Sequence, residues 1–347
     1  MAFQSAAGYG NLPTGAFSPT IFSKEALIAF RKKAVAEDIV NSNYMDEIRA
    51  YGDTVRIIRE PEIKVRPYAR GGSVTPQDLL DEDFTLIIDR ANAFAFKVDD
   101  IEEKHSHIEW MELATNRAAY NLAEEYDADL LGYMSGYERD INTGVWSART
   151  SPVGTKAIAS ADDDELLAAN KLGREQFGGS AADSIAVDPV RGTGDATPLQ
   201  VINRMCRRLD ELNVPEEGRW LVIDPVFYEM LQDEDSKFMN ADYQKTEQLS
   251  NGKLNAPMVR GFTLYGSNSL PLLGTGPDTV DVNGSTVNFG VISAGHTTGV
   301  SSASQITKTE RLRMENSFGD LVRGLHLYGR KIIRPEALVR AAYNRAA

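Results

Sequence analysis

Residues 313–338 read RMENSFGDLVRGLHLYGRKIIRPEAL, and this stretch decides what kind of sheet the chain builds toward its end. Apolar and polar side chains alternate along it: Leu325 and Leu327 share one face, and His326 and Tyr328 share the other. Such alternation predicts a β-strand. The end of this strand combines a proline with several charged residues: Pro335, Arg330, Lys331, Arg334 and Glu336. So many charges are unusual at the last strand of an enzyme.

A second region of period two precedes it, between residues 53 and 100. Its outgoing half runs to Gly71-Gly72, and its returning half is DEDFTLIIDRANAFAFKVDD. The returning half places these apolar residues on one face: Phe84, Leu86, Ile88, Phe94, Phe96 and Val98. We expect a long two-stranded hairpin with a charged tip. Because an isolated hairpin is marginal in water, contacts from outside must stabilise it.

Helical spacing follows this hairpin. Asp99 and Asp100 occupy an N-cap position, and Glu102 and Glu103 follow as in a capping box. The apolar stripe then continues to about Met134, through Ile108, Met111, Ala118, Leu122, Tyr126, Leu130 and Tyr133. At about 1.5 Å per residue this predicts a helix roughly 50 Å long. We expect this spine helix to pack on a sheet.

The second half of the chain mixes helices and strands. Residues 136–197 are rich in loops and indicate a domain boundary. Thr197 and Pro198 predict the start of a helix that ends near Asn213. Its expected buried stripe is Ile202, Met205, Cys206, Leu209 and Leu212. Further elements are predicted at RWLVIDP (219–225), VFYEMLQD (226–233), GFTLYGSN (261–268) and STVNFGVISAG (285–295), with a hairpin turn at Asn283-Gly284. Without regular βαβ repetition, the fold class is α+β.

Composition limits the possible functions. The chain has 347 residues, room for two or three packed units at about 100–150 residues each. Its net charge of -13 argues against nonspecific binding to nucleic acid, which needs clustered Lys and Arg. The sequence contains no run of about 18 apolar residues, so no membrane-spanning helix is predicted. The N-terminus lacks the pattern of a secretory signal. We therefore expect a cytoplasmic compartment and no membrane partner.

No catalytic, metal or cofactor site is expected, and the protein is expected not to be an enzyme. GxxxxGK[ST] and GxSxG do not occur, and no GxGxxG follows a strand. His105 and His107 would face apart on a helix, which favours a solvated or interfacial pair over a metal site. The acidic run at 161–165 is better explained as a solvated helix start than as a cation site. Cys206 is the only cysteine, which excludes an intrachain disulfide and a cysteine-based zinc site, and we expect it to be a packing residue.

The order of these parts resembles the major capsid proteins of tailed bacteriophages with the HK97-like fold, most closely those of short-tailed, autographivirus-like phages. Four segments carry the resemblance: KVDDIEEKHSHIEWMELATNRAAYNLAEEYDADLL (97–131), LNVPEEGRWLVIDPVFYEML (212–231), GFTLYGSNSLP (261–271) and FGDLVRGLHLYGRKIIRPEALV (318–339). Their order along the chain is as specific as their content. Residues 1–45 and 136–197 match the family only in length and character.

The resemblance implies a domain plan. An N-terminal arm would occupy residues 1–51, an extended loop residues 52–100, and a peripheral domain with the spine helix residues 101–196. An axial domain would follow at 197–307, and residues 308–347 would return to the peripheral domain. The resemblance also implies a structural role: self-assembly into hexamers and pentamers of an icosahedral shell that encloses double-stranded DNA without binding it specifically.

The same resemblance implies partners and contacts. A scaffolding protein and a portal protein are the expected partners, and the sequence leaves the presence of a decoration protein open. Assembly is expected in the host bacterial cytoplasm, with a final location in the virion. The expected subunit contacts are Phe17, Phe22, Arg66, Tyr68, Arg70, Asp78, Asp81, Glu82, Arg330, Lys331 and Arg334. Lys64 and Asn344 are residue types that an intersubunit crosslink would use. Two other classes compete: an encapsulin-type bacterial compartment shell, which shares the fold, and a soluble enzyme.

Overall fold

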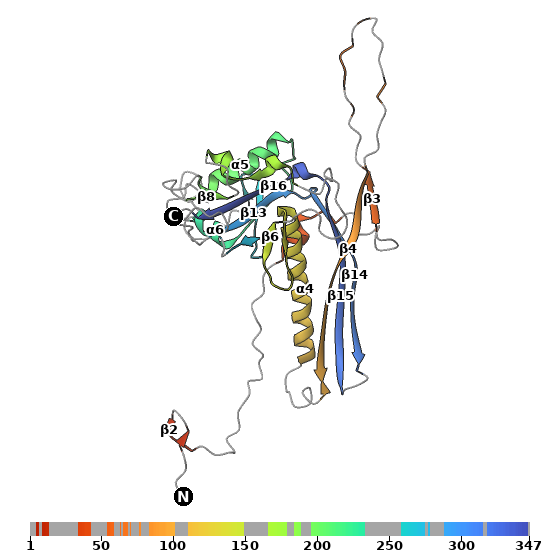
Figure 1. Ribbon diagram of the computed structural model, residues 1–347, viewed down its shortest axis with the longest axis vertical. Helices are drawn as coiled ribbons and strands as arrows, with labels where there is room; N and C mark the ends of the chain where they lie inside the picture. The colour runs from red at the N-terminus through yellow and green to blue at the C-terminus, as the bar shows by residue number, and fades with distance from the viewer. Residues whose placement is uncertain are drawn as a thin grey trace.

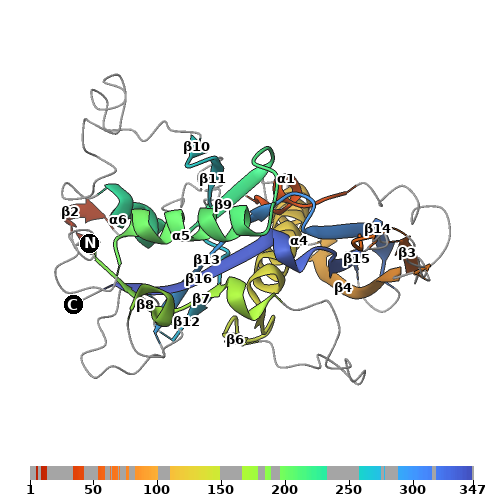
Figure 2. The same ribbon diagram turned by 90° about the horizontal axis from the view of Figure 1, so that it is seen from above.

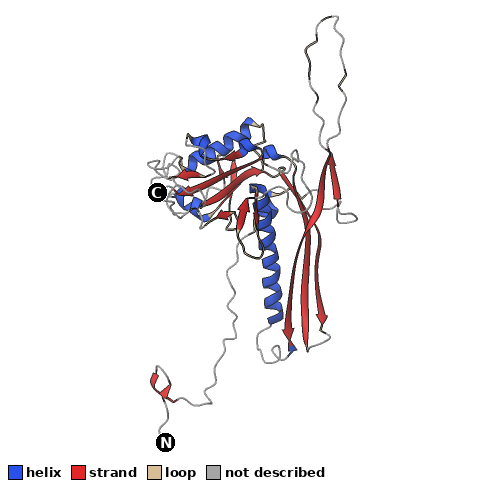
Figure 3. Ribbon diagram, viewed as in Figure 1, coloured by secondary structure: helices blue, strands red, loops and turns tan. Residues whose placement is uncertain are grey.

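The computed structural model describes residues 34–42, 54–58, 83–100, 110–148, 166–178, 184–188, 196–232, 258–274, 288–314 and 318–345, with residues 5–6, 9–13, 277 and scattered positions from 63 to 77. Two sheets organise these residues (Figure 1). A four-stranded sheet of long strands runs beside the longest helix, and an eight-stranded sheet lies toward the C-terminus (Figure 3). The expected α+β class is therefore confirmed.

The four-stranded sheet is entirely antiparallel and has the order β14-β15-β4-β3. Its strands are β3 (Thr54–Ile58), β4 (Asp83–Asp99), β14 (Val300–Arg313) and β15 (Gly319–Ile332). Among the described strands, β3 pairs with β4 only from Asp83 to Ile87, while β15 pairs with β4 from Ile88 to Asp99. The predicted returning half of the hairpin thus continues into the body of the sheet.

The helix α4 (Trp110–Ser135) covers one face of this sheet. On β4 the predicted face is the covered one, since Val98 is buried and Phe94 and Phe96 are half-buried. On β15 the alternation is also confirmed, and the covered face is that of Tyr328, which is 2% exposed. The Leu325 face points away from α4, because Tyr328 packs edge-on against Tyr126 of the helix.

The described part of the spine helix is shorter than the predicted 101–134, because residues 101–109, with His105 and His107, lie outside the described residues. The 26 residues of α4 correspond to about 39 Å. Its C-terminal part enters the core, where Leu130 and Leu131 are 0% exposed. One end of α4 is therefore fixed in the body of the protein, and the other follows the long strands.

The eight-stranded sheet has the order β10-β11-β9-β13-β16-β7, with β12 on β13 and β8 on β16. Its strands are β7 (Lys171–Leu172), β8 (Ile185–Val187), β9 (Arg219–Ile223), β10 (Met258–Val259), β11 (Phe262–Gly266), β12 (Leu272–Leu273), β13 (Phe289–His296) and β16 (Leu338–Arg345). The helices α5 (Pro198–Glu211) and α6 (Pro225–Gln232) cover one face (Figure 2). The C-terminal end of α4 packs on the other face.

The helix α5 begins and ends where the sequence predicts. The Thr197 side chain accepts a hydrogen bond from the Gln200 amide at 3.4 Å, and the Gln200 side chain accepts one from the Thr197 amide at 3.2 Å. This capping box satisfies amides that the first helical turn leaves unpaired. Asn213 has a positive φ of 55° and ends the helix as expected. Strand β9 is buried at every position.

The end of the chain differs from the expectation. Residues 308–347 were expected to return to the domain of the spine helix, and β15 does so. However, β16 lies in the eight-stranded sheet, antiparallel to β13 and parallel to β7 and β8. Its sequence LVRAAYNR has no clean alternation, because this strand is covered on both faces.

The remaining described elements are short: β1 (Ser5–Ala6), β2 (Tyr9–Pro13), α1 (Ala36–Ile39), β5 (Tyr137–Arg139), β6 (Trp146–Ala148) and 3-10 turns at Ala168–Asn170, Arg174–Phe177 and Pro335–Ala337. The predicted turn at Asn283-Gly284 and the acidic run at 161–165 lie outside the described residues. Within the described part of the chain, no helix is both long and apolar enough to cross a membrane.

Candidate assembly surfaces

The segment between β3 and β4 exposes large apolar side chains. In the isolated chain Ile63 is 69% exposed, Val65 97% and Tyr68 66%. Arg66 and Arg70 are exposed in the same stretch, as expected. Ile63 and Val65 were not among the predicted contact residues, although their alternation with charged neighbours in EIKVR was a usable signal. Clustered apolar exposure of this kind marks a surface that another molecule covers.

A second apolar surface lies on the face of the four-stranded sheet that points away from α4. Leu312 is 41% exposed and Leu325 36%. Small side chains of β4 continue this outer face at Ala91, Ala93 and Ala95, which are all exposed. One ion pair crosses it, between Arg323 Nη2 and Glu310 Oε2 at 2.6 Å. The outer face therefore combines apolar side chains with charged ones, among them the exposed Asp89 and Lys97 of β4.

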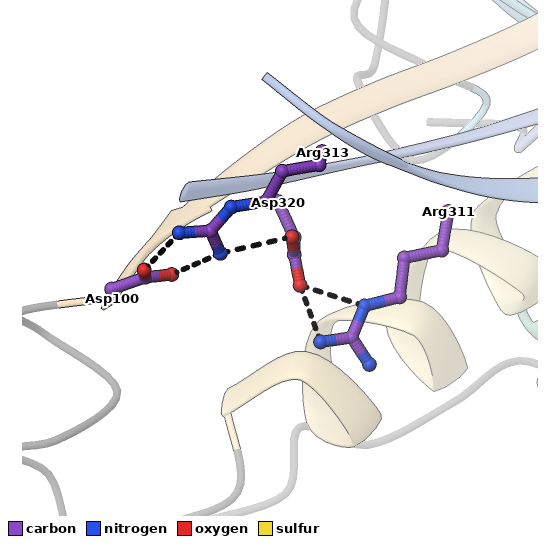
Figure 4. A network of polar contacts seen from close by, with 4 residues as sticks. All are labelled: Asp100, Arg311, Arg313 and Asp320. Carbon is purple, nitrogen blue, oxygen red and sulfur yellow. Dashed lines mark hydrogen bonds and ion pairs between the residues drawn. The ribbon is translucent and has the colours of Figure 1, made fainter. Parts of the chain in front are cut away.

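A network of ion pairs holds the far end of this sheet together (Figure 4). Arg313 lies between Asp100 and Asp320, with Nη1 2.7 Å from Asp100 Oδ1 and 3.3 Å from Asp320 Oδ1. Arg311 Nε donates to Asp320 Oδ2 at 2.8 Å. Hydrogen bonds from Arg311 lower the pKa of Asp320 below its ordinary value. The network joins the consecutive strands β14 and β15 to the end of β4, since Asp100 is 213 residues from Arg313 in sequence.

The basic residues predicted as subunit contacts at the end of β15 differ in their exposure. The Arg330 side chain is only 5% exposed, and its Nη1 lies 2.5 Å from Asp129 Oδ2 on α4. Its guanidinium also stacks over the Tyr133 ring, 4.5 Å from the centroid. The subunit contact at Arg330 stays a prediction, and within its own chain this side chain is buried against α4. Lys331 is partly exposed and Arg334 is exposed, so both retain surface for a partner.

Five predicted contact residues lie outside the described residues: Phe17, Phe22, Asp78, Asp81 and Glu82. Lys64 also lies outside them, while Asn344 lies on β16 and pairs with Ala186 of β8. Of the predicted contacts, the described residues therefore bring together Arg66, Tyr68 and Arg70 in one stretch, and Lys331 and Arg334 in another.

A groove of about 540 Å³ is lined by residues of α4, of α1 and of the covered face of the long sheet. Its lining is largely apolar and small: Ala34, Ala36, Glu37, Val40, Ser42, Phe94, Thr115, Ala119, Leu122, Ala123, Tyr126, Ser302, Ser304, Thr309 and His326. Burial lowers the pKa of His326 in this lining. The groove shows that the N-terminal two-thirds of α4 packs less closely on the sheet than its buried C-terminal end.

Two kinds of reactive group can be assessed in the described residues: metal ligands and the thiol of Cys206. No cluster of three or more His, Cys, Asp or Glu side chains there could hold a metal ion. Cys206 Sγ lies 3.7 Å from Asp210 Oδ2 and 3.7 Å from Arg219 Nη1. Burial raises the pKa of this thiol, with the Asp210 charge adding to the effect. A thiol that resists ionisation is a poor nucleophile, in agreement with a packing role.

Comparisons with known proteins identify the architecture. No family model matches the chain, and no curated protein matches it. Solved structures do match. One from Mycobacterium phage Che8 has a TM-score of 0.67 and 22% identity, covering 95% of this chain and 98% of that chain. The capsid of the cyanophage P-SCSP1u has a TM-score of 0.64 and 17% identity, covering 96% of each chain. The capsid of Ralstonia phage GP4 has a TM-score of 0.62 and 14% identity, covering 99% of each chain.

The three matches cover 95–99% of this chain and 96–99% of the matched chains. Identities of 14–22% at this coverage establish a shared fold. The chain has the HK97-like fold of phage capsid proteins.

Proposed function

We propose that this chain is the major capsid protein of a tailed bacteriophage, which self-assembles into hexamers and pentamers of an icosahedral shell around double-stranded DNA. A fold alone does not carry a function, so the proposal needs a feature of this chain. That feature is the stretch between β3 and β4, where Val65 is 97% exposed and Ile63 69%. A chain that worked alone would have no use for such apolar surface far from its core, whereas a shell subunit would cover it with a neighbour.

The outer face of the long sheet offers a matching surface. Apolar side chains at Leu312 and Leu325 are partly exposed there, beside the small residues of β4. In the proposed shell, the β3–β4 excursion of one copy lies on the outer face of the next, and Arg66, Tyr68 and Arg70 contribute to that contact. Lys331 and Arg334 belong to a second contact at the end of β15. Closed symmetry would repeat each contact throughout the shell.

The proposal includes the domain plan stated above: arm, extended loop, peripheral domain and axial domain, with β16 now assigned to the axial sheet. It also includes a scaffolding protein and a portal protein as partners, assembly in the host cytoplasm, and a place in the virion. The short-tailed, autographivirus-like subtype is proposed on the sequence segments alone. An encapsulin-type shell remains the alternative, and none of the described residues forms a feature that favours it.

Negative-stain electron microscopy of the expressed chain, alone and with a candidate scaffolding protein, tests the proposal. We expect closed shells of uniform diameter with the scaffold, and small oligomers or irregular particles without it. Uniform shells in high yield from the purified chain alone would disprove scaffold dependence. A chain that stays monomeric at high concentration with and without scaffold would disprove the capsid role.

A further inference from the structure

A buried carboxylate on α4 holds the segment that leads to the N-terminus. We call residues 34–42 the strap. The backbone amides of Val35 and Ala36 each donate to Asp127 Oδ1 at 2.8 Å. Asp127 is 1% exposed and lies more than 90 residues further along the chain. A single carboxylate oxygen thus fixes the beginning of the strap.

The strap needs this help because its own residues do not supply it. The N-cap of α1 is Val35, whose side chain makes no capping hydrogen bond. Ser, Thr, Asp or Asn usually fills this position, because their side-chain oxygens accept bonds from the first amides. Here Asp127, on another helix, instead accepts hydrogen bonds from the N-cap amide of Val35 and from the first helical amide, that of Ala36. The start of α1 therefore depends on a folded α4.

The carboxylate also reaches a third part of the chain. Ser267 Oγ donates to Asp127 Oδ2 at 3.5 Å, and Ser267 lies just beyond β11. Burial raises the pKa of Asp127, while its hydrogen bonds with the Val35 and Ala36 amides oppose that rise. A buried carboxylate is costly unless it is hydrogen-bonded. Releasing the strap would remove two of its donors, so the strap and the carboxylate stabilise each other.

The far end of the strap is held separately. The Asn41 amide donates to the Val300 carbonyl at 3.0 Å, and the Ser302 amide donates to the Asn41 carbonyl at 3.2 Å. These bonds attach the strap to the edge of β14. Between the two attachments, Ala36 and Ile39 are each 1% exposed, in the core cluster of the C-terminal part of α4. Asp127 is thus the attachment nearest to residues 1–33.

We propose that Asp127 is the positioning residue of the strap: it fixes where the chain enters the body of the subunit at Val35, and shell assembly requires this fixed entry. The expected effect on assembly rests on the proposed shell function. The attachment of the strap to Asp127 does not. The attachment exists within one chain, and it can be measured on unassembled subunits.

Hydrogen exchange of unassembled subunits tests the attachment. In the natural chain, the Val35 and Ala36 amides are expected to be protected; exchange at the unprotected rate would overturn the proposal without any variant. In Asp127→Ala, the peptide covering residues 34–42 is expected to exchange roughly tenfold faster or more, because both amides lose their acceptor. Asp127→Asn keeps an oxygen acceptor in place and is expected to restore protection to within about threefold of the natural chain.

Asp129→Ala is the matched control. It removes the same group from α4 two residues further along, where the carboxylate contacts Arg330 and Tyr328 and not the strap. We expect it to accelerate exchange in β15 and to leave the strap peptide near its natural rate. If Asp127→Ala and Asp129→Ala accelerate the strap equally, the effect is general loosening and the proposal is wrong.

Assembly then tests the consequence. Folded Asp127→Ala subunits are expected to give fewer closed shells than the natural chain, and Asp127→Asn is expected to recover them. Normal shells from an Asp127→Ala subunit with a released strap would overturn the claim that assembly requires a fixed entry of the strap. If the natural chain forms no shells at all, the proposed function fails, while the exchange result still decides the attachment.

Discussion

Arg330 and Arg334 lie in one short basic stretch, yet their surroundings are opposite. The Arg330 guanidinium is buried against Asp129 and Tyr133, whereas Arg334 is exposed beside the 3-10 turn at Pro335–Ala337. Tyr328 completes the buried group, since its hydroxyl donates to Asp129 Oδ2 at 2.8 Å. Burial raises the pKa of Tyr328, so this hydroxyl stays protonated and remains a donor.

Replacing each arginine by alanine separates their roles. Arg330→Ala leaves Asp129 buried without its cation, and we expect a loss of about 3–5 kcal/mol in the free energy of unfolding. Arg334→Ala is expected to change it by about 0.5 kcal/mol or less. Urea unfolding of unassembled subunits measures both. A neutral Arg330→Ala that nevertheless blocks assembly would support the predicted subunit contact of this residue.

The pH dependence of Asp320 can be tested separately. Its pKa is lowered by hydrogen bonds from Arg311, with the Arg313 bonds adding to the effect. A carboxylate with a lowered pKa contributes stability above the ordinary aspartate value of about 3.9 and loses it as the pH falls through the lowered value. We expect the unfolding free energy of the natural chain to fall more steeply below about pH 4 than that of Asp320→Asn. Parallel curves for the two proteins would contradict a charged role for this carboxylate.

At the scale of elements, two irregular positions flank Tyr328. On β14 the register shifts between Ser304 and Ile306, and between β15 and β4 it shifts at Tyr328 and Gly329. Such bulges bend the strand that carries them and increase its local twist. Gly329 lies at this bend with the backbone of β4 very close, since a Cβ atom there would lie 2.3 Å from the Ile87 carbonyl oxygen.

Gly329→Ala is therefore expected to destabilise the sheet. The backbone of β4 cannot move aside as a side-chain end could, so we expect a loss of about 1–3 kcal/mol or more. Gly266→Ala on β11 is the control, because a Cβ there meets nothing within 4 Å. Thermal unfolding of the two variants measures the difference. Equal midpoints would show that the bend relaxes easily.

The strands also show what the sequence could and could not predict. Alternation on β4 correctly identified the covered face, because Phe94, Phe96 and Val98 are large and apolar while their neighbours are small or charged. On β15 both faces carry large side chains, so alternation predicted the strand but left its covered face open. Strand β16 is buried on both faces along most of its length, so its sequence LVRAAYNR gave no alternating signal. The role of Asp127 depends on contacts across more than 90 residues, which no local pattern contains.

At the scale of the whole molecule, the β3–β4 excursion is expected to matter for assembly and not for folding. Arg66 and Arg70 are exposed, and exposed ion pairs contribute only about 0–1 kcal/mol each. Reversing both to Glu should leave the melting temperature of unassembled subunits nearly unchanged and reduce shell yield, because the contact is repeated throughout the shell. A large fall in subunit stability would instead assign the excursion to the core of the subunit.

The overall charge bears on the enclosed DNA. The chain has 50 acidic residues against 37 basic ones. We expect unassembled subunits to bind duplex DNA no more tightly than about 0.1 mM at physiological salt, the weak end of nonspecific binding. Fluorescence anisotropy with a labelled duplex measures this directly. Micromolar affinity with a steep salt dependence would reveal a basic face and argue against a passive container.

The central positions of β15 and β16 also affect how the protein is made. β15 pairs with β14 on one side and β4 on the other, and β16 lies between β13 and β7. Neither sheet can form the strand pairs of β15 and β16 until residues 319–345 have left the ribosome. Synthesis proceeds at about 5–20 residues per second, so these strands emerge last. Nascent chains on one messenger RNA therefore cannot join a growing particle early. Each subunit enters the pool for assembly only after translation has passed its final strands.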